Sequence, residues 1–213
     1  MDSVTRLLVV RHGETAWNAA ARIQGHTDID LNDTGRWQAE RLADALADED
    51  IAAFYASDLA RARETARAVA DRHGKAVKTT RDLRERCFGE YEGRSWQQLR
   101  EDHPHESEQW RTRVPDYAPP GGESLVQVRD RVVQALTDIA ARHRGEQVLV
   151  VAHGGVLDHF YRAATRVDLQ APRSWQLANA AINRLLWSPE GLTLVGWGDT
   201  FHLDTGSLDE NTV

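Results

Sequence analysis

The order of apolar and polar residues along the chain predicts strands and helices in alternation. Unbroken apolar runs are typical of strands covered on both faces, and they occur at Leu7–Val10, Ile51–Tyr55 and Val148–Ala152. The first run lies within an expected strand Val4–Arg11, and a shorter strand is expected at Ala76–Thr80. Apolar residues at helical spacing predict helices over Thr34–Asp48, from about Leu59 to Val69, over Leu125–Ile139 and over Val156–Thr165. The runs Ala180–Trp187 and Thr193–Trp197 predict a hairpin around Pro189-Glu190-Gly191. This alternation predicts an α/β protein with a mainly parallel sheet.

Polar residues mark where several of these elements begin. Ser57 or Asp58 can cap the helix that starts near Leu59, and Ser124 with Gln127 matches a capping box for the next long helix. The polar segment from Gly13 to Asp33 predicts a loop with one helical turn.

The segment Leu83–Gly122 departs from this regular pattern. It mixes aromatic residues, such as Trp96 and Trp110, with arginines, histidines and acids and has little periodicity. A chain of 213 residues slightly exceeds the usual size of one domain, so we expect residues 1–213 to form a single domain with an insertion at about residues 86–122. Such a segment could cover a pocket, or it could be a pair of satellite helices that pack their own tryptophans.

Composition narrows the partners and the compartment. The chain has 26 Lys and Arg against 33 Asp and Glu, and the resulting net charge of −7 argues against a nucleic-acid surface. Cys87 is the only cysteine, which excludes an internal disulfide and suits a reducing compartment. The sequence has neither a signal-like N-terminus nor an apolar stretch long enough for a membrane span. We therefore expect a cytoplasmic protein that binds neither nucleic acid nor a membrane; the sequence leaves its oligomeric state open.

Two strand ends carry the candidate chemistry. The first apolar run ends in Arg11-His12-Gly13, and the Val148 run ends in His153-Gly154-Gly155. Ligands of such sheets bind at the carboxyl ends of the strands, so neighbouring strands would bring both imidazoles to one ligand. Arg61 follows another strand, in the first turn of its helix, and is expected on the same side of the sheet as His12.

Arginines and histidines that converge with glycines describe a site for a compact dianion such as phosphate. The planar guanidinium group matches phosphate oxygens two at a time. A neutral imidazole can attack phosphorus through one nitrogen while a hydrogen bond at the other fixes its tautomer. Glu85 lies just before the aromatic segment, where a carboxyl group shielded from water could protonate a leaving oxygen.

These residues resemble the histidine phosphatase superfamily, also called the phosphoglycerate mutase-like family. Its signature looks like Arg11-His12-Gly13-Glu14-Thr15 with Trp17-Asn18 beyond it. Further matches follow in order at Gln24-Gly25, Asp28, Thr34-Gly35, Gln38-Ala39, Ser57-Asp58-Leu59-Ala60-Arg61-Ala62, Thr65-Ala66, Leu83-Arg84-Glu85, Phe88-Gly89, Tyr91-Glu92-Gly93, Trp96, Gly121-Gly122-Glu123-Ser124 and Val151-Ala152-His153-Gly154-Gly155. Ordered matches over most of the chain are far more specific than an isolated Arg-His-Gly. Asp30 departs from the family pattern, since many members have proline there.

The resemblance implies a fold, an activity and a set of site residues. The fold would be a three-layer α/β sandwich, with a mostly parallel central sheet, helices on both faces and a small insertion covering the active site. His12 would become phosphorylated, and Arg11, Arg61 and His153 would hold the phosphoryl group. Glu85 would donate and recover the proton. The pocket would be lined by Asn18, Gln24, Gly25 and Gly154.

Among the activities of this family, the sequence favours a metal-independent phosphomonoesterase that hydrolyses a small phosphorylated metabolite without a cofactor. A mutase needs extra cations and a closed cover, whereas the segment after Glu85 is of modest length and Arg111 and Arg113 are not adjacent. Three alternatives remain open. They are a phosphoglycerate mutase, a non-catalytic member that binds a phosphorylated ligand, and a metal site that uses His12, His153 and Glu14, although no local ligand spacing supports the last.

Overall fold

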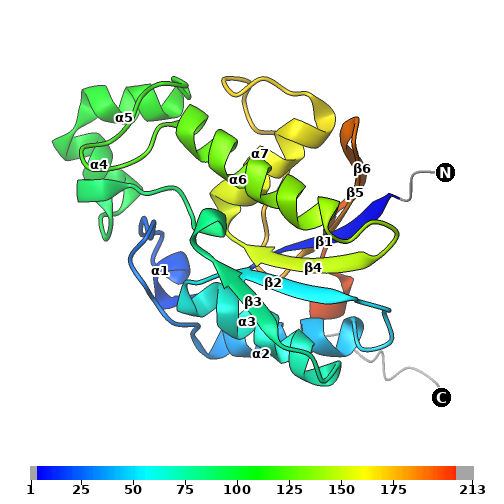
Figure 1. The fold of residues 1–213 in the computed structure, drawn as a ribbon. Coiled ribbons are helices and arrows are strands. Elements are labelled where there is room, and N and C mark those ends of the chain that lie inside the picture. Colours follow the sequence, from blue (N-terminus) through cyan, green and yellow to red (C-terminus); the bar gives the residue numbers. More distant parts are fainter. Residues whose placement is uncertain (1–3, 205–213) are drawn as a thin grey trace, which may run out of the picture.

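The structure, a computed structural model, describes residues 4–204 and is built on one six-stranded sheet (Figure 1). The strands lie in the order β3-β2-β4-β1-β5-β6. Their bounds are β1 Thr5–Arg11, β2 Ala53–Ser57, β3 Val77–Thr80, β4 Gln147–Ala152, β5 Ile182–Ser188 and β6 Gly191–Asp199. The longer helices are α2 Asp33–Ala45, α3 Ala60–Arg72, α6 Leu125–Ala141 and α7 Gly154–Thr165. The expected α/β sheet is confirmed.

Strands β3, β2, β4 and β1 run parallel to one another, and the β5–β6 hairpin adds two antiparallel strands along the free side of β1. The first strand in sequence therefore lies inside the sheet, between β4 and β5. Helices cover both of its faces, which explains why its central residues Leu7, Leu8, Val9 and Val10 are all apolar. The mostly parallel sheet agrees with the prediction, and the antiparallel pair is the predicted hairpin.

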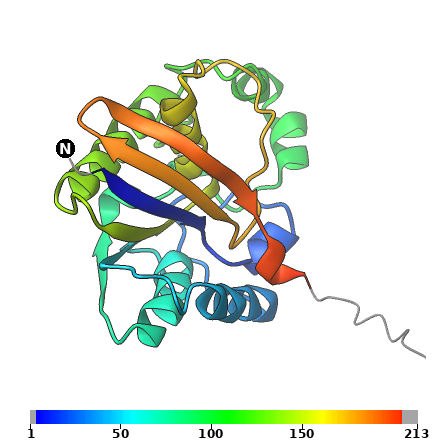
Figure 2. The same cartoon turned by 90° about the vertical axis from the view of Figure 1, so that its right-hand side faces the viewer.

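Helices cover both faces of the sheet (Figures 1 and 2). On one face, Leu7 and Val9 of β1 share a buried cluster with apolar residues of α6 and α7. On the other face, Leu8 and Val10 share a second cluster with α2 and α3. Side chains alternate between the faces of a strand, so the continuous apolar run of β1 supplies both cores. The result is the three-layer arrangement expected from the sequence.

One helix cap was assigned wrongly from the sequence. The N-cap of α3 is Leu59, which makes no side-chain capping bond. Ser57 is still part of β2, and both carboxylate oxygens of Asp58 accept hydrogen bonds from Arg84 at 2.7 Å. A competing long-range ion pair therefore occupies the side chain that the local sequence offered as a cap. By contrast, the capping box of Ser124 and Gln127 is present at the start of α6.

Other boundaries differ from the predictions by a few residues. Helix α7 begins at Gly154, directly after His153, rather than at Val156. Helix α2 ends at Ala45 instead of Asp48, and β2 begins at Ala53 instead of Ile51. In the first loop the expected helical turn is α1, Ala16–Ala19. Such shifts are ordinary, because element ends depend on caps and tertiary contacts more than on periodicity.

The aperiodic segment folds into short elements near the carboxyl ends of the parallel strands (Figure 1). After the 3-10 turns η1 Arg81–Leu83 and η2 Gly89–Tyr91 come α4 Trp96–Asp102 and α5 Pro104–Arg111. The ring of Phe88 stacks on Trp110 at 4.8 Å between centroids, and Trp96 lies 5.1 Å from Trp110. The tryptophans thus pack on one another, as one of the two interpretations expected. Elsewhere in the described chain, one more 3-10 turn, η3 Phe201–Leu203, follows β6.

Within residues 4–204, none of the helices combines the length and the apolar character that crossing a lipid bilayer requires.

Truncation of a core side chain in the central strand β4 should destabilise the protein strongly. Leu149 is fully buried against α2 and α3, so Leu149→Ala should lower the free energy of unfolding by about 2–5 kcal/mol. Val195→Ala is the matched control on β6, because Val195 is 58% exposed and should change it by less than about 0.5 kcal/mol. Urea denaturation followed by circular dichroism measures both, and equal losses would contradict this account of the core.

Candidate active site

The two strand-end histidines lie side by side. In the parallel β1–β4 pair, Arg11 is opposite Ala152, and the backbone N–H of His12 donates to the Ala152 carbonyl at 3.0 Å. The next residues along the strands are therefore His12 and His153, whose ring centroids are 5.1 Å apart. Both side chains are buried. The sequence argument depended on these strands being neighbours, and the register shows that they are.

His12 is held as a neutral imidazole with one free nitrogen. Burial, together with the nearby charges of Arg61 and Arg11, lowers its pKa well below the usual value. A neutral ring carries one proton, and Nδ1 lies 2.7 Å from the Gly13 carbonyl, so this nitrogen is the donor. Nε2 is left with its lone pair. This is the tautomer that a nucleophile at phosphorus needs.

The backbone beside His12 is fixed by close packing. The N–H of Gly13 donates to Thr65 Oγ1 at 3.0 Å, and the side-chain amide of Asn179 donates to the His12 carbonyl at 2.8 Å. A Cβ on Gly13 would lie 2.5 Å from the carbonyl oxygen of Gly35, a backbone atom that cannot move aside cheaply. Glycine is therefore required here for the approach of two backbone segments.

Arg61 is completely buried, in the first turn of α3, on the same side of the sheet as His12. Its Nη1 and Nη2 donate to the carbonyls of Thr27 and Gly25, at 3.0 and 2.8 Å. Within residues 4–204 its Nε has no hydrogen-bond partner. Burial lowers the pKa of Arg61 to about 10, so it remains a cation near neutral pH. The loop carbonyls orient the guanidinium group and leave its Nε–H and the second N–H of each terminal nitrogen for a ligand.

Arg11 provides a second buried guanidinium group. Its Nη1 donates to the carbonyl of Leu177, and its Nε, like that of Arg61, has no partner. Burial lowers its pKa, while the negative charge of Glu85 opposes that effect. Both ring nitrogens of His153 are also buried without a hydrogen bond. Buried polar atoms are rarely left unpaired, so this concentration of free donors around His12 indicates a binding site for an anion.

Glu85 lies beside the loop that holds Arg61, since Nε2 of His26 in that loop is 2.9 Å from the Glu85 carbonyl. Its Oε2 accepts a hydrogen bond from the backbone N–H of Gly155 at 2.9 Å, and its Oε1 accepts one from the N–H of Arg86 at 2.8 Å. A Cβ on Gly155 would lie 2.3 Å from Oε1 of this carboxylate. The second glycine after His153 thus lets the carboxylate approach the start of α7.

A cavity of about 270 Å³ opens onto these groups. It is lined by residues of the first loop and of the strand ends, namely Arg11, His12, Trp17, Asn18, Ala21, Arg22, Ile23, Gln24, Gly25, Arg61, Glu85, Phe88 and Trp96. A second cavity of about 640 Å³ shares Arg11, Glu85, Phe88 and Trp96 with it and also contains Gly154. Except for His153, each predicted site residue lines one or both of these cavities. The ring of His153 lies 5.1 Å from that of His12 but lines neither cavity.

The second cavity contains charged residues to which the sequence assigned no role. Arg86 stacks on Trp110 at 4.3 Å, and burial lowers its pKa to about 10. Arg113 donates to Asp158 at 2.7 Å, and His159 is buried beside them. Arg86 could have been found from its position next to Glu85. Asp158 and His159 could not, because at helical spacing in α7 they look like ordinary polar positions.

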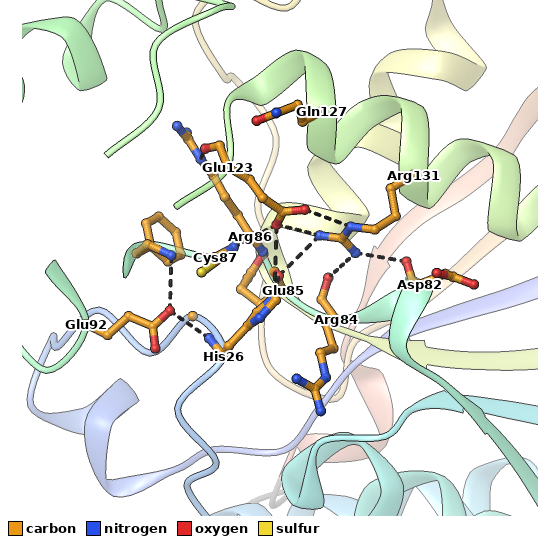
Figure 3. A network of polar contacts seen from close by, with 12 residues as sticks. His26, Asp82, Arg84, Glu85, Arg86, Cys87, Glu92, Glu123, Gln127 and Arg131 are labelled. Carbon is orange, nitrogen blue, oxygen red and sulfur yellow. Dashed lines mark hydrogen bonds and ion pairs between the residues drawn. The ribbon is translucent and has the colours of Figure 1, made fainter. Parts of the chain in front are cut away.

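The carboxylate of Glu92 connects the first loop, Gly13–Asp33, to the aromatic-rich segment Leu83–Gly122. Glu92 accepts hydrogen bonds from the backbone N–H groups of His26, Thr27 and Phe88 at 2.8–3.0 Å. Figure 3 shows the part of this arrangement around His26 and Glu92. The loop that carries Gln24 and Gly25, whose carbonyl orients Arg61, is thus fixed to the aromatic segment. Glu92 thereby reinforces the backbone hydrogen bonds of Ile23 with Gly93 and Arg94, which join the same two segments.

The metal-binding alternative would require a cluster of histidine, cysteine or carboxylate ligands. Among residues 4–204, no three side chains of histidine, cysteine, aspartate or glutamate come together in a way that could hold a metal ion. Near His12 the abundant groups are cationic guanidiniums, which repel a cation.

Comparisons with known proteins agree with this geometry. The family model described as "Histidine phosphatase superfamily (branch 1)" matches residues 7–200. Two similar proteins of Arabidopsis thaliana are phosphoglycerate mutase-like protein 4, 42% identical over 95% of this chain and 89% of that protein, and a metal-independent phosphoserine phosphatase, 40% identical over 96% and 85%. The solved structure of Bacillus stearothermophilus YhfR superposes with a TM-score of 0.88 at 32% identity, covering 94% of this chain and all of that one.

The buried histidines should make the protein less stable in mild acid. The pKa of His12 and of His153 lies well below the usual value, and burial lowers that of His159 to about 4. As pH falls below about 6.5, the unfolded chain takes up protons that the folded chain does not, so the free energy of unfolding falls. Each such histidine contributes a slope of up to about 1.4 kcal/mol per pH unit.

This slope can be assigned by substitution. His159→Asn removes a titrating group that lines the second cavity and should flatten the dependence between pH of about 6 and 4.5. Urea denaturation at a series of pH values measures the slope. An Asn variant with the same slope as the unsubstituted protein would show that His159 is not buried in its neutral form.

Proposed function

This chain belongs to the histidine phosphatase superfamily, and on that premise we propose that it is a metal-independent phosphomonoesterase that hydrolyses a small phosphorylated metabolite through a phosphohistidine intermediate. The observation that carries the proposal is the state of His12. Its neutral ring has Nδ1–H engaged by Gly13 and Nε2 free, and unpaired donors of Arg11 and Arg61 lie nearby. A group that only bound phosphate would gain nothing from a fixed, unprotonated nitrogen.

In the first step, Nε2 of His12 attacks phosphorus and the bond from phosphorus to the ester oxygen breaks. Arg11, Arg61 and the neutral ring of His153 would donate hydrogen bonds to the non-bridging oxygens as their charge redistributes. Glu85 would give a proton to the departing oxygen, which leaves as an alcohol. The imidazole is already oriented before substrate arrives, so little reorganisation is needed at the moment of reaction.

In the second step, water attacks the phosphoryl group and the P–N bond breaks. Glu85 would accept a proton from that water, which restores its starting state, and phosphate leaves with His12 again neutral. The same arginines hold the phosphoryl group in both steps. Asn18, Gln24, Gly25 and the backbone of Gly154 would complete the pocket; Gln24 Oε1 is buried and has no partner.

The larger cavity indicates what the rest of the substrate looks like. Arg86, Arg113 and Arg173 line it together with the rings of Trp96 and Trp110. Cations beside aromatic walls suit a compact, polar leaving group that bears a negative charge, such as a phosphorylated hydroxy or amino acid. The similarity to a protein named as a phosphoserine phosphatase supports this class. The two helices α4 and α5 would then act as the cover of the site. A cytoplasmic location is part of the proposal, because the single cysteine suits a reducing compartment.

Removal of the nucleophile should abolish turnover without unfolding the chain. His12→Ala should lower phosphate release from p-nitrophenyl phosphate by at least about 1,000-fold, because it removes Nε2, the atom that forms the P–N bond in the proposed mechanism. His105→Ala in α5, where the side chain is exposed, is the matched control and should retain full activity. Both assays are run in EDTA. Full activity of the His12 variant, or loss of activity with chelator in the unsubstituted enzyme, would contradict the proposal.

A second measurement separates hydrolysis from mutase chemistry. One relative is named as mutase-like, and both reactions use a phosphohistidine. With 3-phosphoglycerate and a trace of bisphosphoglycerate, we expect free phosphate to form faster than 2-phosphoglycerate, because both cavities are only partly enclosed and so admit water. Phosphorus NMR of the mixture distinguishes the products. Faster formation of 2-phosphoglycerate would assign the chain to the mutases instead.

A further inference from the structure

Arg131, on helix α6, uses its whole guanidinium group to hold one short segment of chain (Figure 3). Its Nη1 donates to the carbonyls of Asp82 and Arg84, both at 2.9 Å, and its Nη2 reaches the carbonyl of Glu85 at 3.4 Å. Three backbone acceptors within four residues thus converge on one side chain. Such a fork fixes position and orientation together, which a single hydrogen bond would not do.

Glu123 completes this arrangement from the other side. Its two carboxylate oxygens accept from Nε and Nη2 of Arg131, at 2.9 and 2.7 Å. One of them also accepts from the backbone N–H of Cys87 at 2.9 Å. Burial raises the pKa of Glu123, but the hydrogen bonds from Arg131 and Cys87 outweigh that effect and keep it low. The pair is therefore ionised near neutral pH, and it brackets Glu85 on both sides along the chain.

The bracketed segment has no regular structure of its own. It lies between the 3-10 turns that end at Leu83 and begin at Gly89. Regular backbone pairing therefore does not fix where Glu85 stands. Besides Arg131, only His26 Nε2 contacts the Glu85 carbonyl within the described part of the chain, at 2.9 Å. The direction of the Glu85 carboxylate, which accepts from Gly155, thus depends on how Arg131 and Glu123 hold the neighbouring residues.

We propose that Arg131, held by Glu123, is the positioning residue for the proton donor of this enzyme, Glu85. This inference rests on the proposed function, in which Glu85 protonates the leaving oxygen. Arg131 lines neither of the two cavities, so it acts on the reaction only through the backbone around Glu85. Its contribution should therefore appear only where a proton must be delivered or taken up.

The leaving group of the substrate separates this role from a merely structural one. Hydrolysis of β-glycerophosphate releases an alkyl alcohol, whose oxygen needs a proton as it departs. Hydrolysis of p-nitrophenyl phosphate releases a stabilised phenolate that needs none. The parameter kcat/KM reports the step in which the ester bond breaks, so it is compared for the two esters.

We expect Arg131→Met to lower kcat/KM for β-glycerophosphate roughly 100-fold, as is typical when a catalytic group is displaced by about 1 Å. For p-nitrophenyl phosphate the loss should stay within about 3-fold, because no proton transfer is needed in that step. Glu85→Gln should show the same selective loss, to a larger extent. If Arg131 acts through Glu85, the double variant should be no worse than Glu85→Gln alone.

Two further variants control for folding and charge. Arg129→Met lies two residues away on the same helix, and its exposed side chain pairs with Asp130; it should leave both esters unaffected. Glu123→Gln keeps the shape of the partner and removes its charge, so it should cause a milder form of the same selective loss. This variant tests the positioning role even where Arg131→Met is poorly folded. Thermal unfolding of each variant shows which of them are folded.

The outcomes distinguish the positioning role of Arg131 from the role of Glu85 as the proton donor. Equal losses on the two esters for folded Arg131 and Glu123 variants, with a selective loss for Glu85→Gln, would overturn the positioning role and leave the proposed function intact. A Glu85→Gln variant that loses activity equally on both esters would overturn the assignment of the proton donor itself. Additive losses in the double variant would show that Arg131 acts independently of Glu85.

Discussion

The structure depends on the parallel pairing of β1 with β4. This register puts Arg11 opposite Ala152, so His12 and His153, one residue further along each strand, lie next to each other. A slip of one residue in this pairing would move every side chain of one strand to the opposite face of the sheet. His12 and His153 would no longer be neighbours, and the alternating apolar side chains would no longer reach the two hydrophobic layers. The same constraint that forms the core therefore also places two imidazoles within 5.1 Å of each other. Fold stability and the reactive geometry cannot be separated here.

The second feature is a concentration of polar groups kept from water before any ligand arrives. Arg61 is fully buried, and within residues 4–204 the Nε atoms of Arg61 and Arg11 and both nitrogens of His153 lack partners. Leaving such groups unpaired costs stability, since each has given up its hydrogen bonds to water. A phosphoryl group would accept hydrogen bonds from the two Nε–H groups and from the one N–H of the neutral His153 ring. The protein thus holds its site in a state that is unfavourable without substrate and is compensated on binding, which is how preorganised sites stabilise developing charge.

The proposed proton donor is supported in a different way from the proposed nucleophile. His12 follows a central strand and is fixed by the sheet, whereas Glu85 lies in an irregular segment between two 3-10 turns. Its position is fixed chiefly by Arg131, on α6, and by Glu123, which precedes that helix (Figure 3). Glu92 performs a similar task for the loop that orients Arg61. Outside regular secondary structure, charged side chains with several hydrogen bonds fix the positions of the site residues.

The sequence by itself determined the alternation of elements, the two-sided burial of β1 and β4, and the site residues that follow those strands, because strand periodicity and the strand-end rule act locally. It also predicted the capping box at Ser124, which is a contact across only three residues. The cap proposed at Asp58 was wrong because its carboxylate binds Arg84, 26 residues away. The sheet order, the hydrogen bonds that hold Arg61 on the loop and the hold of Arg131 on the Glu85 segment were decided only by the tertiary structure. Each joins residues distant in the chain, and no local pattern records which distant partner a charged side chain will meet.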